Sequence, residues 1–143
     1  RAALQAEREP VASPSALLLI GLRHLRSNNS WMHNIAALAK GPDRSCLEIH
    51  PDDARDRQIA DGALVRIATR KGAIEVTASI SSRVRPGVVS LPHGHGHGDP
   101  GTRMAVAARM GGANFNALTD EDEWDRLSGI AVLNGIPVEV TPL

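Results

Sequence analysis

Short apolar runs separated by turn residues dominate this sequence and limit what it can fold into. Residues 16–22 form a continuous apolar run, whereas residues 64–70 and 73–80 alternate apolar with polar side chains around a Lys71-Gly72 turn, the pattern of a β-hairpin. Further short runs lie at residues 46–49, 88–91, 130–133 and 136–140. Because these runs do not alternate with long helices, we expect a mainly β fold in which six or seven strands close into a barrel with short helical insertions.

Local signals assign individual elements within this pattern. The unbroken apolar character of residues 16–22 predicts a strand that is buried on both faces. Residues 35–40 suit a short helix, and Thr119 or Asp120 suits the N-cap of another. Asn134-Gly135 is a strong two-residue turn signal, so it predicts a second hairpin between the last two apolar runs.

Charge, hydropathy and cysteine content exclude several function classes. The chain carries 16 Lys and Arg against 16 Asp and Glu, which argues against a nucleic-acid partner held by bulk charge and against a basic membrane-binding patch. The longest apolar run is far below the roughly 20 residues of a membrane span. Cys46 is the single cysteine, so this chain alone forms no disulfide framework, Cys-based zinc finger or iron–sulfur cluster.

The length of 143 residues suits one domain. We interpret residues 1–14 as a linker or the remnant of a preceding domain, and residues 15–143 as the domain itself. No charged-then-apolar signal sequence is visible at the first residues, which favours a cytoplasmic over a periplasmic location without fixing it.

Three polar segments are candidates for a binding site. The first, residues 23–34, follows the first strand and holds two arginines, two serines and three asparagines, side chains that could recognise phosphates and a polar heterocycle. Such a loop could instead cap its own backbone. The third segment contains Asn114 and Asn116, whose amides are good partners for pterin or purine edges.

The second segment is the run from His93 to His97, in which histidine alternates with glycine. In an extended conformation its three imidazoles would share one face and could hold zinc or nickel. The glycines favour a flexible loop instead, in which the imidazoles contact a ligand or solvent. Residues 96–101 match G-x-G-x-x-G, but the helix and second parallel strand that a dinucleotide-binding βαβ unit requires do not follow.

The order of these motifs resembles the C-terminal cofactor-binding domain of molybdopterin oxidoreductases, the family of formate dehydrogenases, nitrate reductases and dimethyl sulfoxide reductases. The resemblance covers about residues 15–141 and rests on residues 18–34, 50–54, 60–62, 65–67, 86–94, 114–119 and 125–129. It implies a six-stranded double-psi β-barrel. It also implies a domain that closes over a bis-(molybdopterin guanine dinucleotide) cofactor carrying Mo or W, which is bound mainly by the remaining domains of the parent oxidoreductase.

By position in the family, three groups of residues would line this cofactor: Arg23, Arg26, Ser27, Asn28, Asn29 and Ser30; His93, Gly94, His95, Gly96 and His97; and Asn114 and Asn116. Two departures stand out, because relatives have Trp at the position of His95 and Gly at the position of Gln58. A left-handed Gln58 would cost roughly 1 kcal/mol relative to Gly.

The family's metal ligand and cysteine-rich cluster segment have no match in this chain. We therefore expect the isolated chain to position a cofactor without catalysing the redox reaction itself. Two alternatives stay open, because a fold alone does not fix a function. One is a double-psi barrel that recognises a protein partner or substrate, and the other is a small metal-binding protein built on its histidines.

Overall fold

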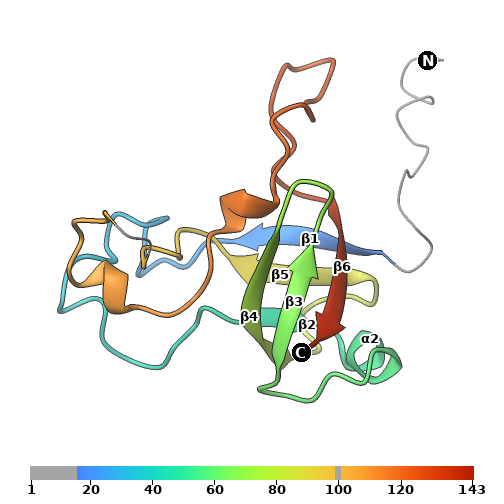
Figure 1. Ribbon diagram of the computed structural model, residues 1–143, viewed down its shortest axis with the longest axis horizontal. Helices are drawn as coiled ribbons and strands as arrows, with labels where there is room; N and C mark the ends of the chain where they lie inside the picture. The colour runs from blue at the N-terminus through green and yellow to red at the C-terminus, as the bar shows by residue number, and fades with distance from the viewer. Residues whose placement is uncertain (1–15, 99–100) are drawn as a thin grey trace.

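The computed structural model describes residues 16–98 and 101–143, so the predicted linker over residues 1–14 lies outside the described part (Figure 1). Six strands form one closed barrel. They are β1 (Leu17–Leu22), β2 (Leu47–Ile49), β3 (Leu64–Ala68), β4 (Ala73–Ile80), β5 (Val88–Pro92) and β6 (Ile136–Pro142). The helical insertions are α2 (Pro51–Asp56) and the 3-10 turns η1 (Ala107–Arg109) and η2 (Phe115–Leu118). None of the helices in the described residues is long and apolar enough to cross a membrane.

The strand order around the barrel is β1-β5-β2-β4-β3-β6, with β6 returning to pair with β1. Two neighbouring pairs are parallel, β1 with β5 and β2 with β4, and the other pairs are antiparallel. Each parallel pair joins strands that are not consecutive in the chain, which is the crossed connection of a double-psi barrel. The expected six-stranded double-psi β-barrel is therefore confirmed, and its closure leaves no open sheet edge.

Apolar side chains from all six strands fill the barrel, alternating with exposed ones most clearly in β1, β3 and β6. The core is aliphatic except at one end, where Phe115 is buried together with Leu118 of η2. Burying each large apolar side chain stabilises the fold by about 1.5–3 kcal/mol. The remaining members come mostly from the strands: Leu17, Leu19, Leu47, Ile49, Val65, Ile67, Val76, Ala78, Val89, Leu91, Val138 and Val140.

Three local predictions are wrong. Residues 35–40 make only a turn, in which the N–H groups of Leu38 and Ala39 both donate to the carbonyl of Ile35. No helix follows Thr119, which instead ends η2, while the Asp120 carboxylate accepts from the N–H of Asp122 in a further turn.

The predicted second hairpin is the third error. Residues 130–133 form no strand beyond an isolated bridge, and β6 pairs with β1 and β3 instead. Asn134-Gly135 does not join two paired strands; it contacts β1 just before β6 begins. The Asn134 side chain accepts from the N–H of Gly21, and the N–H of Gly135 donates to Leu19. Closing the barrel gives β6 two full partners, which a local hairpin could not supply.

Long loops leave the barrel on two sides (Figure 1). Residues 23–46, 93–98 and 101–114 extend together from the end at which β1 and β5 finish. Residues 119–135 project separately, on the side of β6 and the β3–β4 turn, and are called the finger below. Residues that bind a ligand are therefore to be sought at two different places.

Candidate functional site: a cationic groove at the loop end of the barrel

The parallel pairing of β1 with β5 brings the first two polar segments together. In parallel strands the carboxyl ends lie side by side, so Arg23 after β1 and His93 after β5 begin their loops at the same edge. The N–H of His93 continues the ladder by donating to the carbonyl of Leu22 at 2.9 Å. The predicted convergence of these segments thus follows from the barrel topology.

Two glycines let the segments pack at backbone distance. A Cβ on Gly94 would lie 2.4 Å from the carbonyl oxygen of Asn29, and a Cβ on Gly96 would lie 2.4 Å from the backbone nitrogen of Asn114. Both glycines have positive φ angles, 88° and 86°. Only glycine fits these positions, so the His-Gly segment contacts both the first and the third polar segment.

The histidines of this segment do not share one face. The ring of His93 stacks on Phe115 at 5.3 Å, whereas the rings of His95 and His97 lie 4.5 Å and 5.8 Å from His33. The positive φ angles of the intervening glycines break the extended geometry that the metal hypothesis needed. Among residues 16–98 and 101–143 no group of three or more His, Cys, Asp or Glu side chains is arranged to hold a metal ion.

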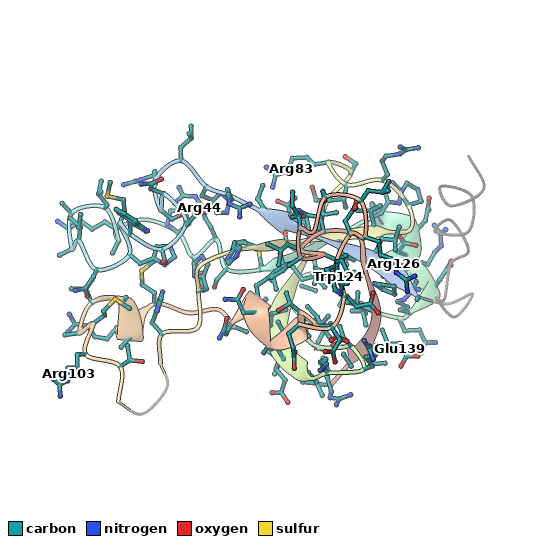
Figure 2. The ribbon with its side chains drawn as sticks, turned by 90° about the horizontal axis from the view of Figure 1, so that it is seen from above. Arg44, Arg83, Arg103, Trp124, Arg126 and Glu139 are labelled. Atoms are coloured by element: carbon teal, nitrogen blue, oxygen red, sulfur yellow. The ribbon has the colours of Figure 1, made fainter. Side chains whose placement is uncertain are left out.

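A groove of about 610 Å³ opens between the loops. Five cationic side chains line it, with Asp43 as the single carboxylate, and none of the five makes an ion pair within the described residues. Figure 2 shows Arg44 in this part of the molecule, far from Glu139 on β6. The cations are Arg23, Arg26, Lys40, Arg44 and Arg109. Such a surplus of unpaired positive charge around a concave surface attracts anions.

Four of the predicted site residues line this groove: Arg23, Arg26, Ser27 and His95. Others shape the loops behind it. Asn28 and Asn29 have left-handed backbone angles of 42° and 62°, and the Asn29 side chain accepts from Nε of Arg23 at 2.6 Å. The backbone of Ser30 lies against Gly94, and His97 Nε2 lies 2.7 Å from the Gly94 carbonyl.

The third segment is near the loops but does not line the groove. The Asn114 side chain caps η2 by accepting from the N–H of Asn116, and the Asn116 carbonyl accepts from Thr119. The side-chain amide of Asn114 thus caps the backbone of its own segment. The sequence allowed this structural role for the first polar segment, residues 23–34. Asn116 itself is exposed at this end of the barrel.

Sequence reasoning missed five residues of the groove: His24, His33, Lys40, Arg44 and Arg109. His33 is 3% exposed, and its Nδ1 has no hydrogen-bond partner, an arrangement that leaves a buried polar atom for a ligand or water to satisfy. Lys40 and Arg44 flank Gly41-Pro42, a turn that could have been recognised as a basic loop. Arg109 lies more than 60 residues from them in sequence, and no motif marks it.

Burial controls the charge state of the groove histidines. It lowers the pKa of His33, against a hydrogen bond to Gly94 that raises it, and it lowers the pKa of His95, which the His33 imidazole lowers further. The Ser45 hydroxyl lowers the pKa of Asp43 by donating to its carboxylate. At neutral pH the imidazoles of His33 and His95 are therefore neutral hydrogen-bonding groups, and the positive potential of the groove comes from the arginines and Lys40.

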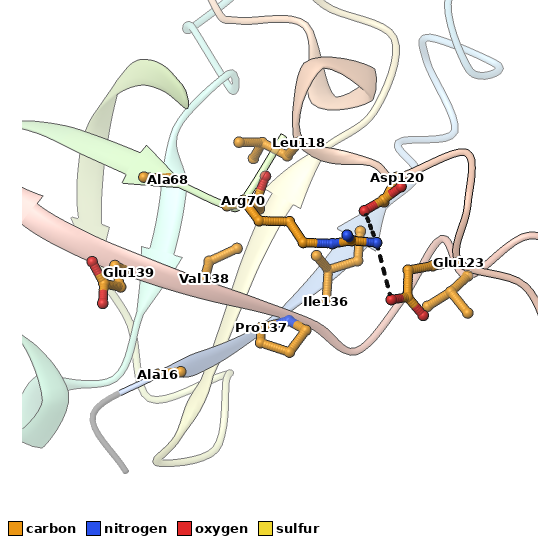
Figure 3. A pocket seen from close by; sticks show the side chains of 12 residues that line it. Ala16, Ala68, Arg70, Leu118, Asp120, Glu123, Ile136, Pro137, Val138 and Glu139 are labelled. Atoms are coloured by element: carbon orange, nitrogen blue, oxygen red, sulfur yellow. Dashed lines mark hydrogen bonds and ion pairs between the residues drawn. The ribbon is translucent and has the colours of Figure 1, made fainter. Parts of the chain in front are cut away.

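A second cavity, of about 520 Å³, lies between β6, the end of β3 and the start of the finger (Figure 3). Its lining is largely apolar, and its one cation, Arg70, already pairs with the carboxylates of Asp120 and Glu123. Because this charge is neutralised, the cavity does not suit an anion. The cationic groove is the stronger candidate for a phosphate-bearing ligand.

Comparison with known proteins agrees with this chemistry. The family model for the molydopterin dinucleotide binding domain matches residues 17–137. The molybdopterin-containing subunit of arsenate respiratory reductase from Chrysiogenes arsenatis is 32% identical over 114 residues, which are 76% of this chain and 13% of that protein. The alpha subunit of an NADPH-Fe(3+) oxidoreductase from Geobacter sulfurreducens is 32% identical over 115 residues, which are 78% of this chain and 11% of that protein.

A solved structure shows the same fold. Acetylene hydratase from Pelobacter acetylenicus superposes with a TM-score of 0.71 at 22% identity, over 89% of this chain and 18% of that one. The matched region is only about an eighth of the length of the two curated relatives named above. On the match over residues 17–137, the chain belongs to the molydopterin dinucleotide binding domain family of the molybdopterin oxidoreductases.

Proposed function

We propose that this chain binds part of a molybdopterin guanine dinucleotide in the cationic groove, as one section of a larger oxidoreductase. The cofactor would be the bis form with Mo or W, shared with domains that are not in this chain. The observation that carries the proposal is a single groove lined by five cations that make no ion pair within residues 16–98 and 101–143, with Asp43 as the only carboxylate of the described lining. A dinucleotide brings a pyrophosphate, and arginine forks match its oxygens.

The residues of the groove fit such a group. Arg26 and Arg44 both have a guanidinium nitrogen within 4 Å of the position that a Cβ of Gly41 would take, so two forks can address one anion. The partnerless Nδ1 of His33 can accept from an N–H or O–H of a heterocycle or ribose. Ser27, which is 6% exposed, and His95 would complete the polar lining.

In this proposal the chain binds and orients, and the chemistry belongs to the bound group. A molybdenum or tungsten centre supplies redox chemistry once it is bound. The loops after β1 and β5 would fix the anionic part, while the neutral imidazoles avoid burying extra positive charge beside the heterocycle. We therefore expect the isolated 143-residue chain not to turn over formate, nitrate or a sulfoxide.

Titration calorimetry of the isolated chain with GDP, which carries a pyrophosphate and guanosine, tests the proposal. Arg26→Ala should weaken GDP binding at least about tenfold, because a charge-assisted hydrogen bond contributes roughly 1.5–3 kcal/mol and about 1.4 kcal/mol is a tenfold change in affinity. Arg66→Ala is the matched control, since Arg66 is an exposed arginine on β3 outside the groove, and it should leave the affinity unchanged. Absent GDP binding by the unmodified chain, or equal effects of the two variants, would contradict the proposal.

A further inference from the structure

The outer face of β1 is apolar, and no segment in the described part of the chain covers it. Its sequence predicts burial on both faces, yet only the inward side chains Leu17 and Leu19 are buried, while Leu18 and Ile20 are 42% and 37% exposed. Leu18 lies directly opposite Pro137 of β6 in the antiparallel register, so the two side chains point outward together. The prediction that this strand is buried on both faces is therefore correct for its inner face and wrong for its outer face. The exposed apolar side chains of the outer face need an explanation.

The finger extends this surface with four large apolar side chains. Trp124, Leu127, Ile130 and Leu133 are 54%, 68%, 65% and 42% exposed. The finger adjoins β1, because the Asn134 side chain accepts from Gly21 and the N–H of Gly135 donates to Leu19. The second cavity, lined by Val132, Ile136 and Pro137 among others, lies between the finger and the barrel (Figure 3).

The finger holds its shape without burying these side chains. Its two arms are joined by hydrogen bonds from Val132 to Glu123 and from Asp125 to Ile130, and the Asp125 carboxylate accepts from the N–H groups of Leu127 and Ser128. A pre-ordered loop that displays apolar side chains is typical of a binding surface, because little further ordering is needed on contact. We call Leu18, Ile20, Pro137 and the four finger side chains the apolar face.

The rim of the apolar face is acidic. Residues 119–135 carry five carboxylates and one cation, Arg126, while Arg70 and Lys71 of the neighbouring β3–β4 turn pair with four of the five carboxylates. Lys71 contacts three of these carboxylates, those of Asp120, Glu121 and Asp122. A second copy of the chain would bring two such acidic rims together in a symmetric contact, which like charges oppose. The rim instead favours a partner with lysine or arginine around an apolar centre.

We propose that the apolar face is covered by the remaining domains of the parent oxidoreductase, through an apolar surface edged with basic side chains. This inference rests on the proposed function, which places the chain in a longer enzyme. The relatives in which the same domain occurs are about eight times longer than the matched region, so most of the parent lies outside this chain and can supply the cover. The groove and the apolar face then serve different ends, cofactor contact and domain docking.

Cysteine accessibility measures this directly. Leu18→Cys and Leu127→Cys report on the face, and Leu64→Cys is the matched control, because Leu64 is a 48% exposed strand residue outside it. Each is made with Cys46→Ser, in the 143-residue chain and in the whole parent enzyme. N-ethylmaleimide modification of the peptide is followed by mass spectrometry, and unfolding midpoints of the 143-residue variants confirm that they fold.

All three cysteines should react readily in the 143-residue chain. In the parent, modification of the Leu18→Cys and Leu127→Cys variants should slow by about tenfold or more, as for a site that opens only locally, while the Leu64→Cys variant keeps its rate. Equal rates at all three positions in the parent would overturn the inference. So would protection that develops in the 143-residue chain as its concentration rises, which would assign the face to a second copy. Cofactor content of the parent separates the two proposals, because a parent without a pterin cofactor rejects the proposed function whatever the labelling shows.

Discussion

At the scale of single residues, the backbone conformation of Gln58 is strained and costs folding free energy. This residue follows α2 with a φ of 57°, a left-handed conformation that glycine adopts most easily. The N–H of the next residue, Ile59, bonds back to the carbonyl of Ala54, which ends the helix and requires that conformation. The side chain of Gln58 is exposed, so no contact offsets the strain.

Replacing Gln58 should therefore raise stability. Gln58→Gly removes the steric cost and is expected to increase the free energy of unfolding by up to about 1 kcal/mol, measured by urea denaturation. Gln58→Ala is the control, because alanine retains a Cβ and gains nothing at this φ. A stabilisation shared by both variants would show that the strained backbone is not the cause.

At the scale of elements, local signals predicted local structure and failed where distant strands decide. The hairpin of β3 and β4 forms around Lys71-Gly72 as expected, since both strands and their turn are contiguous. The hairpin expected at Asn134-Gly135 does not form, because β6 finds its partners in β1 and β3, far away in the sequence. Pairings of that kind depend on barrel closure, which no window of sequence encodes.

The residues of the groove were likewise predictable only where the sequence places them next to a strand. Arg23 and His95 could be nominated because they lie within three residues of the ends of β1 and β5, and parallel strands place their ends together. Lys40, Arg44 and Arg109 sit in loops whose paths depend on packing between loops, as where the Asn34 side chain accepts from the N–H groups of Val106 and Ala107. Their positive charges give no spacing that distinguishes a groove from an ordinary solvated surface.

The contact between loops makes a prediction about Gly94. Gly94→Ala would place a Cβ 2.4 Å from the Asn29 carbonyl oxygen, so the loops after β1 and β5 must separate. We expect a loss of more than about 2 kcal/mol in unfolding free energy. Gly62→Ala is the control, because Gly62 has a similar positive φ of 77° with no atom within 4 Å of its Cβ position, and it should cost only about 1 kcal/mol. Similar losses in the two variants would mean that backbone strain, and not loop contact, sets the penalty.

At the scale of the whole molecule, charge is divided although its sum is zero. Five cations line the groove and carboxylates gather on the finger, so within the described residues the two loop systems present opposite potentials to their surroundings. The apolar core consists mainly of side chains of the barrel strands together with Phe115 and Leu118 of η2, and includes no groove cation or finger carboxylate. The fold can therefore keep its stability while each loop system meets a different partner, and the groove contains two buried imidazoles, those of His33 and His95.

These buried imidazoles make the stability of the whole chain depend on pH. Burial lowers the pKa values of His33, His93 and His95 below the ordinary 6.5, so the unfolded chain binds protons before the folded chain does. Their contribution is complete above about pH 6.5 and is lost as pH falls toward the lowered values, because folding then opposes protonation. Carboxylates titrate mostly below about pH 5 and add little in this window. The thermal unfolding midpoint should thus decline between about pH 7.5 and 5.5. His33→Asn should make this decline shallower, because it removes one of the buried imidazoles. Leu25→Ala is the control: it changes a fully exposed loop side chain and should leave the pH dependence of the midpoint unchanged. A midpoint that stays level or rises on acidification would mean that the groove histidines are already hydrated and free to take up protons in the folded chain.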